Sequence, residues 1–292
     1  MIAVGFALSR IVFRDESFWI VVEKLTYFVL FPSLLFVTVW RTPIVAGTAL
    51  PVLGAVLGAI AVGIILGYAA QPILRPNPRQ FASGVQCAFR FNSYVFLALS
   101  YRLSSGEGLA LSAVILGVAV PILNIAAVWP LARNTQGRLL GELARNPLLV
   151  ATLAGLLANM AGLPLPALAV TTFERLGAAS LALGLLSVGA GLRLGAIATG
   201  DAASRSSAVR LAVWLTSVKL IAMPLAALAL VRWMDLNPVA AAIVVAYAAL
   251  PTAPSAYILA SRMGGDGPLV AALISLSLIG SAFALPFWLA ML

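Results

Sequence analysis

Apolar stretches long enough to cross a bilayer recur throughout this sequence, and they limit the chain to few kinds of fold. A helix needs about 20 mostly apolar residues to cross about 30 Å of hydrocarbon. Nine stretches meet this need, although the fifth of them is short, and we expect each to form a membrane span. They are Phe18–Val39, Val45–Ile73, Phe81–Tyr101, Gly108–Leu131, Pro147–Ala161, Leu165–Leu192, Ala208–Val231, Val239–Ala260 and Leu269–Leu292.

Composition supports this interpretation. Of the 292 residues, 62% are hydrophobic and only 9% are charged, and the mean hydropathy is +1.07. Soluble globular domains carry about 25% charged residues, so we expect an all-α integral membrane protein. A net charge of +9 could point to nucleic acid, but the basic residues are scattered singly through short loops. We therefore expect the bilayer, and not nucleic acid, to be the partner of these charges.

Two residue types that usually carry chemistry are almost absent. The chain has no histidine, which excludes Ser-His catalysis and histidine metal ligands, and Cys87 has no second cysteine with which to form a disulfide or a thiolate cluster. For an intramembrane enzyme, only a Ser-Lys pair that uses Lys219 remains conceivable. We expect no catalytic residue, no metal site and no cofactor.

The N-terminal stretch Met1–Phe13 is apolar but too short to cross a membrane. It lacks the basic region and the small-residue cleavage site of a signal peptide. We interpret it as the second half of a further span, whose beginning is missing from this chain or whose start was set too late. The prediction is then ten spans, with the first one truncated.

The basic residues between the spans predict the orientation, because cytoplasmic loops carry an excess of Lys and Arg. One set of alternate loops holds only Arg41, Arg102 and Arg232. The other set, which we place in the cytoplasm, holds Arg10, Arg14, Arg75, Arg79, Arg133, Arg138, Arg145, Arg193, Arg205, Arg210 and Arg262. With an even number of spans, both termini then face the outside, which is the periplasm if the protein lies in a bacterial inner membrane.

The two halves of the chain resemble each other. EKLTYFVLFPSLLF, which starts at Glu23, and ERLGAASLALGLLS, which starts at Glu174, each place an acidic-basic-Leu triplet early in a span. Each is the second span of a half with five spans, and an odd number inverts the second half in the membrane. We predict a first inverted repeat over residues 1–131, a cytoplasmic connection over 132–146 and a second repeat over 147–292.

The fourth span of each half is interrupted. The first contains Arg90-Phe91-Asn92-Ser93, and the second contains ALPTAPSAYILA, in which Pro251 and Pro254 break the helical hydrogen bonds. Broken helices at matched positions of inverted halves indicate a transport site. A free helix end beside Asn92 and Ser93 would favour an anionic substrate. Alternatively, Arg90 extends to an interface while Asn92 and Ser93 bond only to local backbone.

Other polar residues inside the spans have two interpretations each. Lys219 is either a counter-charge for a substrate or a structural contact of a broken helix, since a bare charge at that depth costs at least about 2.5 kcal/mol. Glu23 and Glu174 either pair with cations of other helices or act in proton coupling. Asn124 follows Pro121 and either caps freed backbone or lines the site.

Several motifs in order resemble the auxin efflux carrier family, in its bacterial branch: LTYFVLFPSLLF, AFRFNSYVFLAL, VPILN, NPLLVATLAGLL, VKLIAMPL and ALPTAPSAYILASRMGGD. The resemblance implies a ten-span fold of two inverted repeats with two crossing broken helices, similar to bile-acid symporters and sodium/proton antiporters. It also implies transport of small organic anions such as auxins, malate or malonate. Our candidate substrate-binding residues are Arg90, Asn92, Ser93, Tyr94, Asn124, Lys219, Pro251, Thr252, Pro254 and Ser255.

We therefore expect a secondary transporter that moves a small organic anion by alternating access, with one bundle rocking against another. A sodium-coupled carrier of the bile-acid type is one alternative. A sodium/proton antiporter is another, although none of the predicted spans contains Asp. A membrane receptor or scaffold is the alternative outside transport. The expected partners are the lipid bilayer and the anion, and a homodimer is the assembly that we allow for.

Overall fold

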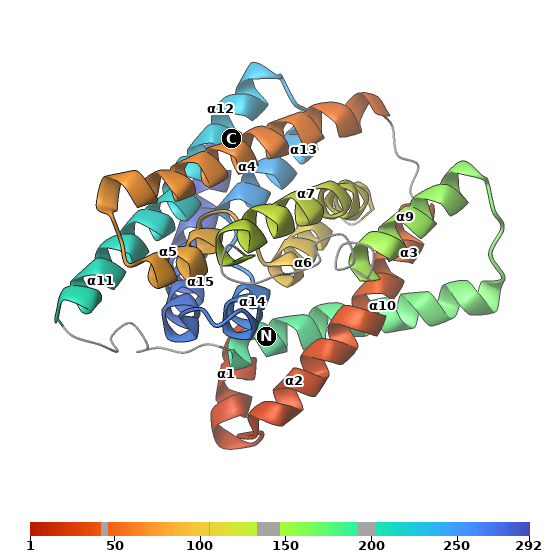
Figure 1. Cartoon of the computed structure of the whole chain (residues 1–292). Helices are drawn as coiled ribbons and strands as arrows, with labels where there is room; N and C mark the ends of the chain where they lie inside the picture. Colours follow the sequence, from red (N-terminus) through yellow and green to blue (C-terminus); the bar gives the residue numbers. More distant parts are fainter. Residues whose placement is uncertain (42–45, 105, 133–146, 192–201) are drawn as a thin grey trace.

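The computed structural model describes residues 1–41, 46–104, 106–132, 147–191 and 202–292, and this part of the chain is helical, without a strand (Figure 1). Most of the predicted cytoplasmic connection, with Arg133, Arg138 and Arg145, lies outside the described residues, as does Arg193. The helices are α1 (Ile2–Ile11), α2 (Glu16–Leu25), α3 (Phe31–Arg41), α4 (Ala46–Leu74), α5 (Pro78–Gly84), α6 (Ser93–Leu103), α7 (Glu107–Ala132), α9 (Pro147–Met160), α10 (Ala167–Ala190), α11 (Ala202–Ser217), α12 (Met223–Trp233), α13 (Pro238–Ala249), α14 (Ser255–Arg262) and α15 (Gly267–Leu289). Three short turns join some of them: the π-helical η1 (Thr26–Leu30) and η3 (Val218–Ala222), and the 3₁₀-helical η2 (Val85–Ala88).

Six helical stretches in the described residues are long and apolar enough to cross a membrane. They are Ser17–Arg41, Ala49–Leu74, Glu107–Leu131, Ala167–Ala190, Ser204–Trp233 and Gly267–Leu289. Three of the nine predicted full spans are not among them. Pro147–Ala161 forms only the 14-residue α9, and Phe81–Tyr101 and Val239–Ala260 are each broken into two helices. Helix length alone thus accounts for six spans and not for the ten that the sequence predicts.

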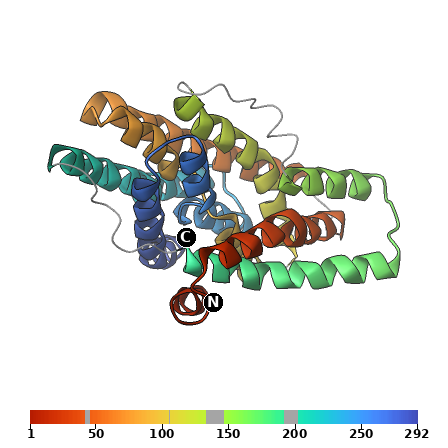
Figure 2. The ribbon, with the colours of Figure 1, turned by 60° about the horizontal axis from the view of Figure 1, so that its bottom comes forward.

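The helices pack as two groups, which lie side by side in both ribbon views (Figures 1 and 2). The first group consists of α1, α2, α3, α9 and α10. The second group consists of α4 to α7 and α11 to α15. Helices α6 and α7 face the first group, because α6 packs against α10 and α7 packs against α3 and α9.

Glycines bring the backbones of the first group close together. A Cβ atom on Gly155 of α9 would lie 2.7 Å from the carbonyl oxygen of Phe36 in α3, and one on Gly177 of α10 would lie 3.1 Å from the Cα of Leu34. Helices that associate inside a membrane commonly meet at small residues, because apolar burial does not drive their association there. The glycines of α9 and α10 therefore account for the tight packing of α3 against both helices.

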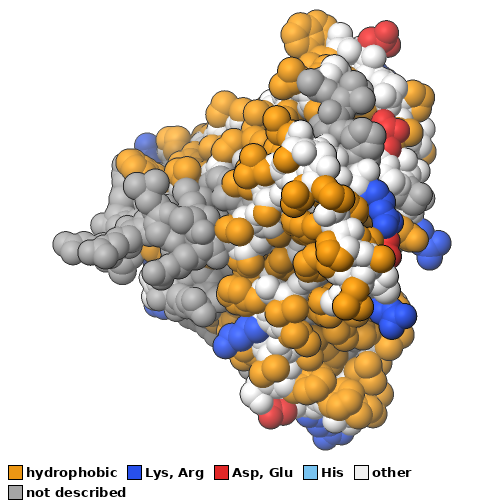
Figure 3. Space-filling view, turned by 90° about the vertical axis from the view of Figure 1, so that its right-hand side faces the viewer, with side chains coloured by type: hydrophobic (Ala, Val, Ile, Leu, Met, Phe, Trp, Pro, Cys, Tyr) orange, Lys and Arg blue, Asp and Glu red, His pale blue; other side chains and the backbone are white. Residues whose placement is uncertain are grey.

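The outer surface is apolar. On the face shown in Figure 3, hydrophobic side chains cover most of the described surface, and Lys, Arg, Asp and Glu side chains lie mainly toward its edges. Large apolar residues on several helices are highly exposed, including Leu168 (81%), Trp233 (81%) and Phe283 (76%). Such a surface suits a hydrocarbon environment, in which exposed leucine and phenylalanine carry no penalty.

Both π-helical turns come just before a proline. Phe31 directly follows η1, and its N–H donates to the carbonyl of Thr26, five residues earlier. Pro32 comes next in the chain. In η3 the N–H of Met223 donates to Val218 in the same way, and Pro224 follows. A proline ring clashes with the carbonyl four residues earlier, and a widened turn relieves this clash without ending the helix.

Side chains from other helices donate to two carbonyls that prolines leave without a helical partner. Pro224 cannot donate to Leu220, and the indole N–H of Trp288 in α15 donates to that carbonyl at 2.9 Å. Pro130 cannot donate to Ala126 in α7, and the hydroxyl of Tyr68 in α4 donates there at 2.7 Å. Each contact satisfies a polar group that water does not reach in a bilayer, and so ties two helices together.

The hydrogen bond between Tyr68 and Ala126 should therefore stabilise the protein only because Pro130 lacks the N–H that would normally bond to this carbonyl. We expect Tyr68→Phe to destabilise the protein by about 1 kcal/mol, since it leaves a buried carbonyl unpaired. In a Pro130→Ala background, residue 130 can donate its own N–H, and the same substitution should cost less than about half as much. Thermal or denaturant unfolding in detergent micelles measures all four proteins of this cycle.

Trp288→Phe with Pro224→Ala provides a second cycle of the same design on different helices. Equal costs of Tyr68→Phe in the two backgrounds would show that the hydroxyl stabilises the protein in some other way.

Candidate functional site

The two helix breaks lie against each other in the second group. The first break, Phe89–Asn92, separates η2 from α6, and the second, Leu250–Pro254, separates α13 from α14. The backbone N–H of Asn92 donates to the carbonyl of Pro251 at 2.8 Å, and the hydroxyl of Thr252 donates to the carbonyl of Cys87 at 2.9 Å. Each break thus supplies hydrogen-bond partners that the other needs inside a membrane.

Local sequence explains why the chain breaks at these two places. Pro251 and Pro254 remove two backbone donors within four residues, so α13 cannot continue beyond Ala249. In the first break, the side-chain oxygen of Asn92 accepts from the N–H groups of Tyr94 and Val95 at 3.0 and 3.2 Å, so Asn92 is the N-cap of α6.

This cap changes the expected chemistry of the first break. The sequence led us to expect free N–H groups beside Asn92 and Ser93 that would attract an anion. In the structure, the N–H groups of Tyr94 and Val95 bond to the Asn92 side chain, and that of Asn92 bonds to Pro251. These three donors are already engaged, so any attraction for an anion must come mainly from another group.

That group is the guanidinium of Arg90. One terminal nitrogen donates to the side-chain oxygen of Gln86 at 3.2 Å. The other donates to the side-chain oxygen of Asn124 in α7 at 3.1 Å and to the hydroxyl of Ser255, the first residue of α14, at 3.2 Å. The side chain therefore joins both breaks and α7, and it remains partly exposed, as do Asn124 and Ser255.

The hydrogen-bond partners of this guanidinium among the described residues are neutral oxygens. The ion pair found in the described part of the chain is between Arg41 and Glu174, at 2.5 Å, and both of these side chains are exposed. No described carboxylate lies within 4.0 Å of the Arg90 guanidinium. A guanidinium has five N–H donors in a planar fork that matches a carboxylate, so Arg90 is well suited to bind an organic anion.

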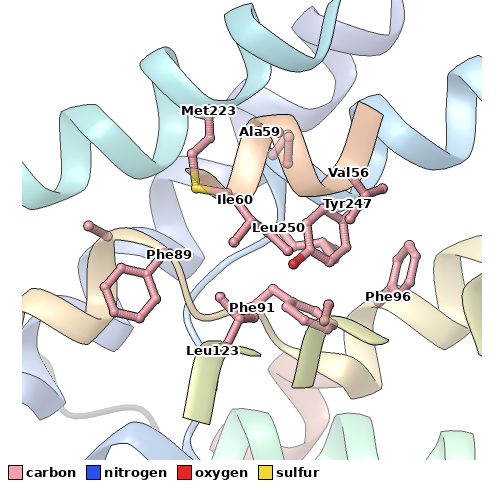
Figure 4. Close-up of a cluster of buried hydrophobic side chains, with 14 of the residues drawn as sticks. Val56, Ala59, Ile60, Phe89, Phe91, Phe96, Leu123, Met223, Tyr247 and Leu250 are labelled. Atoms are coloured by element: carbon pink, nitrogen blue, oxygen red, sulfur yellow. The ribbon is translucent and has the colours of Figure 1, made fainter. Parts of the chain in front are cut away.

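Aromatic side chains enclose the breaks. The ring of Phe91 lies 4.5 Å from that of Tyr247 in α13, and Phe96 lies 5.5 Å from Tyr247 (Figure 4). Tyr94 stacks on Phe31 of the first group at 4.7 Å. The Tyr247 hydroxyl is fully buried and has no hydrogen-bond partner in the described residues, which is unusual for a buried polar atom.

The structure brings most of the predicted site residues together, in different ways. Arg90, Asn124 and Ser255 are joined through their side chains. Asn92 and Pro251 join the breaks through backbone groups, and Thr252 does so through its hydroxyl. Ser93 and Tyr94 begin α6, and Pro254 precedes α14. Sequence reasoning missed Gln86 and Tyr247. Gln86 could have been identified, because it is a polar residue four positions before Arg90 in an apolar run. Nothing in the sequence distinguishes Tyr247.

Lys219 does not join this cluster. It is completely buried in η3, and its ammonium hydrogen-bonds, among described residues, with the sulfur of Met223 at 3.9 Å. The turn packs against η2. A Cβ atom on Gly63 would lie 2.7 Å from the sulfur of Met223 and 3.2 Å from the Cβ of Phe89, so η3 lies beside the first break. Among the described residues, no serine hydroxyl hydrogen-bonds with Lys219, as a Ser-Lys catalytic pair would require.

Residues that could ligate a metal do not gather here. In the described ranges, no group of three His, Cys, Asp or Glu side chains is close enough together to hold a metal ion.

Comparison with protein families identifies the chain at the level of a family. A family model described as "Membrane transport protein" matches residues 104–289. The match includes Asn124, Lys219 and the whole second break, and it begins after the first break. No protein with a curated description matches the chain. Because the model covers more than half of the 292 residues, this protein belongs to the membrane transport protein family of auxin efflux carriers.

Proposed function

We propose that the protein is a secondary transporter that carries a small organic anion across the bilayer by alternating access. The observation that carries this proposal is the position of Arg90, a guanidinium where two helix breaks meet and whose hydrogen-bond partners among the described residues are neutral oxygens. A carboxylate bound to Arg90 would supply the missing negative charge. The anion class is auxin-like compounds or other mono- and dicarboxylates.

The energetics of a charge in a membrane support an anion at this place. A charged residue near the bilayer centre costs at least about 2.5 kcal/mol, and it is usually paired or faces a cavity. Gln86, Asn124 and Ser255 satisfy three hydrogen bonds of Arg90, but their dipoles do not cancel its charge. An anionic substrate would accept hydrogen bonds from the guanidinium and would also neutralise its charge. The attraction between the two charges would be stronger than in water, because the local dielectric constant is low.

We propose the remaining candidate residues as supports of this site. Asn92, Pro251, Thr252 and Pro254 hold the two breaks in place, Ser93 and Tyr94 form the start of α6 beside Arg90, and Asn124 and Ser255 orient the guanidinium. Lys219 would act at longer range, as a second positive charge near the first break. The buried hydroxyl of Tyr247 is a further donor that a substrate could engage.

The order of the helices supports a ten-span arrangement of two inverted repeats. The first half contains α1, then α2 to α3, α4, α5 to α6, and α7. The second half contains α9, α10, α11 to α12, α13 to α14, and α15. In each half the fourth unit is the broken one. We propose that each unit crosses the membrane once, that the two broken units cross near the bilayer centre, and that the two groups of helices move against each other.

The distribution of arginines supports an orientation with both termini outside, in a bacterial inner membrane. In this arrangement, the described loops and helix ends on the cytoplasmic side hold Arg10, Arg14, Arg75, Arg79, Arg205, Arg210 and Arg262. Those on the outer side hold Arg41, Arg102 and Arg232. This asymmetry follows the excess of basic residues in cytoplasmic loops.

Uptake by the purified protein in proteoliposomes tests the proposed function. We expect at least one radiolabelled anion from a panel of malonate, succinate, benzoate and indole-3-acetate to exchange across the membrane faster than in protein-free liposomes. Sodium and pH gradients applied separately reveal the coupling ion. Absence of exchange for every carboxylate of the panel would contradict the proposal.

The role of Arg90 in transport can be measured separately from its contribution to folding. We expect Arg90→Gln to reduce uptake at least tenfold, and Arg90→Lys to recover only part of it, because an ammonium keeps the charge but lacks the planar fork. Arg102→Gln, at the exposed end of α6, the helix that follows the first break, is the matched control and should transport normally. Melting temperatures in detergent should change little, and normal uptake by Arg90→Gln would place the anion elsewhere.

The second break tests whether interrupted backbone is needed. Pro251→Ala together with Pro254→Ala restores two N–H donors, so we expect equal or higher thermal stability together with a loss of uptake. Pro130→Ala, which restores a donor far from the breaks along α7, is the control and should leave uptake intact. Normal transport by the double variant would show that the break at Leu250–Pro254 has only a packing role.

A further inference from the structure

A groove opens between α4 and α7, away from the two helix breaks. Its volume is about 320 Å³, and the residues that line it are Ile64, Tyr68, Ile122, Ile125, Ala126 and Trp129. Ligand pockets in proteins commonly measure about 300–1,000 Å³. This α4–α7 groove is therefore large enough to hold a ligand.

Helix periodicity places the groove and the candidate anion site on different sides of α7. The four lining residues of α7 lie at positions i, i+3, i+4 and i+7, which form one stripe along a helix. Asn124, which accepts a hydrogen bond from Arg90, lies about half a turn round the helix from Ile122. A ligand in the α4–α7 groove would therefore not be the anion at Arg90.

The lining of the α4–α7 groove is apolar or aromatic. The hydroxyl of Tyr68 donates to the carbonyl of Ala126 at 2.7 Å, so it is already used within the protein. Ile125 is 45% exposed and Trp129 is 56% exposed, and both belong to the span Glu107–Leu131. The groove thus opens toward the hydrocarbon of a bilayer, and its ligand must be apolar where it enters.

An exposed arginine follows the same stripe of α4. Arg75 comes 11 positions after Ile64 and seven after Tyr68, and 11 residues make about three full turns of a helix. The N–H of Arg75 donates to the carbonyl of Gln71 at 3.1 Å, so helical bonding reaches this residue. No Asp or Glu oxygen of the described residues lies within 4.0 Å of its guanidinium. A cation thus lies about 10 Å beyond Tyr68 along the helix.

The arginine lies at the end of the α4–α7 groove that is nearer the membrane surface. Helices α4 and α7 run in the same direction (Figures 1 and 2). The hydrogen bond between Tyr68 and Ala126 lies six positions before the last residue of each helix, so their ends are level. Trp129 is three positions before the end of α7, and tryptophan is enriched where hydrocarbon meets water. The groove therefore runs inward from the interface, with Arg75 at the level of the head groups.

We propose that the α4–α7 groove binds an acyl chain of an anionic glycerophospholipid whose phosphate bonds to Arg75. A planar guanidinium matches a phosphate group through two parallel hydrogen bonds. Basic residues beside clefts between membrane helices commonly bind the head groups of anionic lipids. The inference does not depend on which compound the protein transports.

The distribution of charge favours a phospholipid over a second protein molecule as the occupant. The α4–α7 groove has an apolar lining over about 10 Å of α7, from Ile122 to Trp129, and a cation beyond one end. A molecule with one anionic end and a long apolar tail matches this pattern. Phospholipids of this shape surround a membrane span on all sides, and an anionic head group adds attraction to the arginine.

Brominated lipids test this inference, because bromine atoms on an acyl chain quench the fluorescence of a tryptophan that they contact. The protein is reconstituted in phosphatidylcholine liposomes that contain increasing fractions of phosphatidylglycerol brominated on its acyl chains. The signal of Trp129 is the difference between the wild type and Trp129→Phe. We expect half-maximal quenching at a fraction about fivefold lower than with brominated phosphatidylcholine, because one arginine near an anionic lipid contributes about 1 kcal/mol.

Two variants and their matched controls show whether the α4–α7 groove causes this preference. Arg75→Gln should abolish the preference for phosphatidylglycerol, and Ala126→Leu should do the same by filling the groove. Arg210→Gln, at an exposed arginine of α11, and Ala282→Leu, at an exposed alanine of α15, should keep it.

Three results would overturn the inference. The first is equal quenching of the wild type by the two brominated lipids. The second is a preference that survives in both Arg75→Gln and Ala126→Leu. The third is an absence of Trp129 quenching by either lipid, which would show that protein covers the α4–α7 groove.

A second measurement uses neither bromine nor a change inside the groove. We expect added phosphatidylglycerol to raise the melting temperature of the detergent-purified wild type and of Arg210→Gln more than phosphatidylcholine with the same acyl chains does. Arg75→Gln, whose altered side chain is exposed, should respond equally to the two lipids. An equal response of the wild type would contradict a site for an anionic lipid.

Discussion

Every backbone N–H and C=O group inside a bilayer must find a partner within the protein, and this requirement organises the structure described above. Prolines repeatedly remove donors from the helices, and several of these removals have a visible consequence. Trp288 and Tyr68 donate to two of the freed carbonyls, and two widened turns precede Pro32 and Pro224. At the breaks, where whole turns are missing, the chain segments bond to each other through Asn92 and Pro251. The candidate site thus arises where ordinary helical bonding ends.

Charge imposes the second requirement on the structure. Arg90 and Lys219 are cations within the second group. Arg90 lies among oxygen acceptors and is partly exposed, whereas Lys219 is buried beside a methionine sulfur. Of these two cations, Arg90 has the surroundings that suit the anion site we propose.

Sequence reasoning predicted where the two helices break, but it expected free N–H groups beside the first break. Free helix ends beside Asn92 and Ser93 were the expected attraction, and the structure engages those N–H groups with Asn92 itself. Hydrophobic length also led us to expect more long helices than are present, since a run such as Phe81–Tyr101 is apolar whether or not its helix is continuous. Tyr247 could not have been selected, because a tyrosine in an apolar helix shows its missing partner only in the packed protein.

The sequence by itself determined the membrane class, the approximate positions of the spans and the places where helices break. These depend on local properties, namely apolar length, a missing proline N–H and an asparagine that caps the next helix. Only the tertiary structure decided which groups meet. Arg90 reaches Asn124, 34 positions away, and Ser255, 165 positions away, while Lys219 points to its own neighbour Met223. Contacts over such distances in the chain depend on how helices pack, and no short stretch of sequence encodes that.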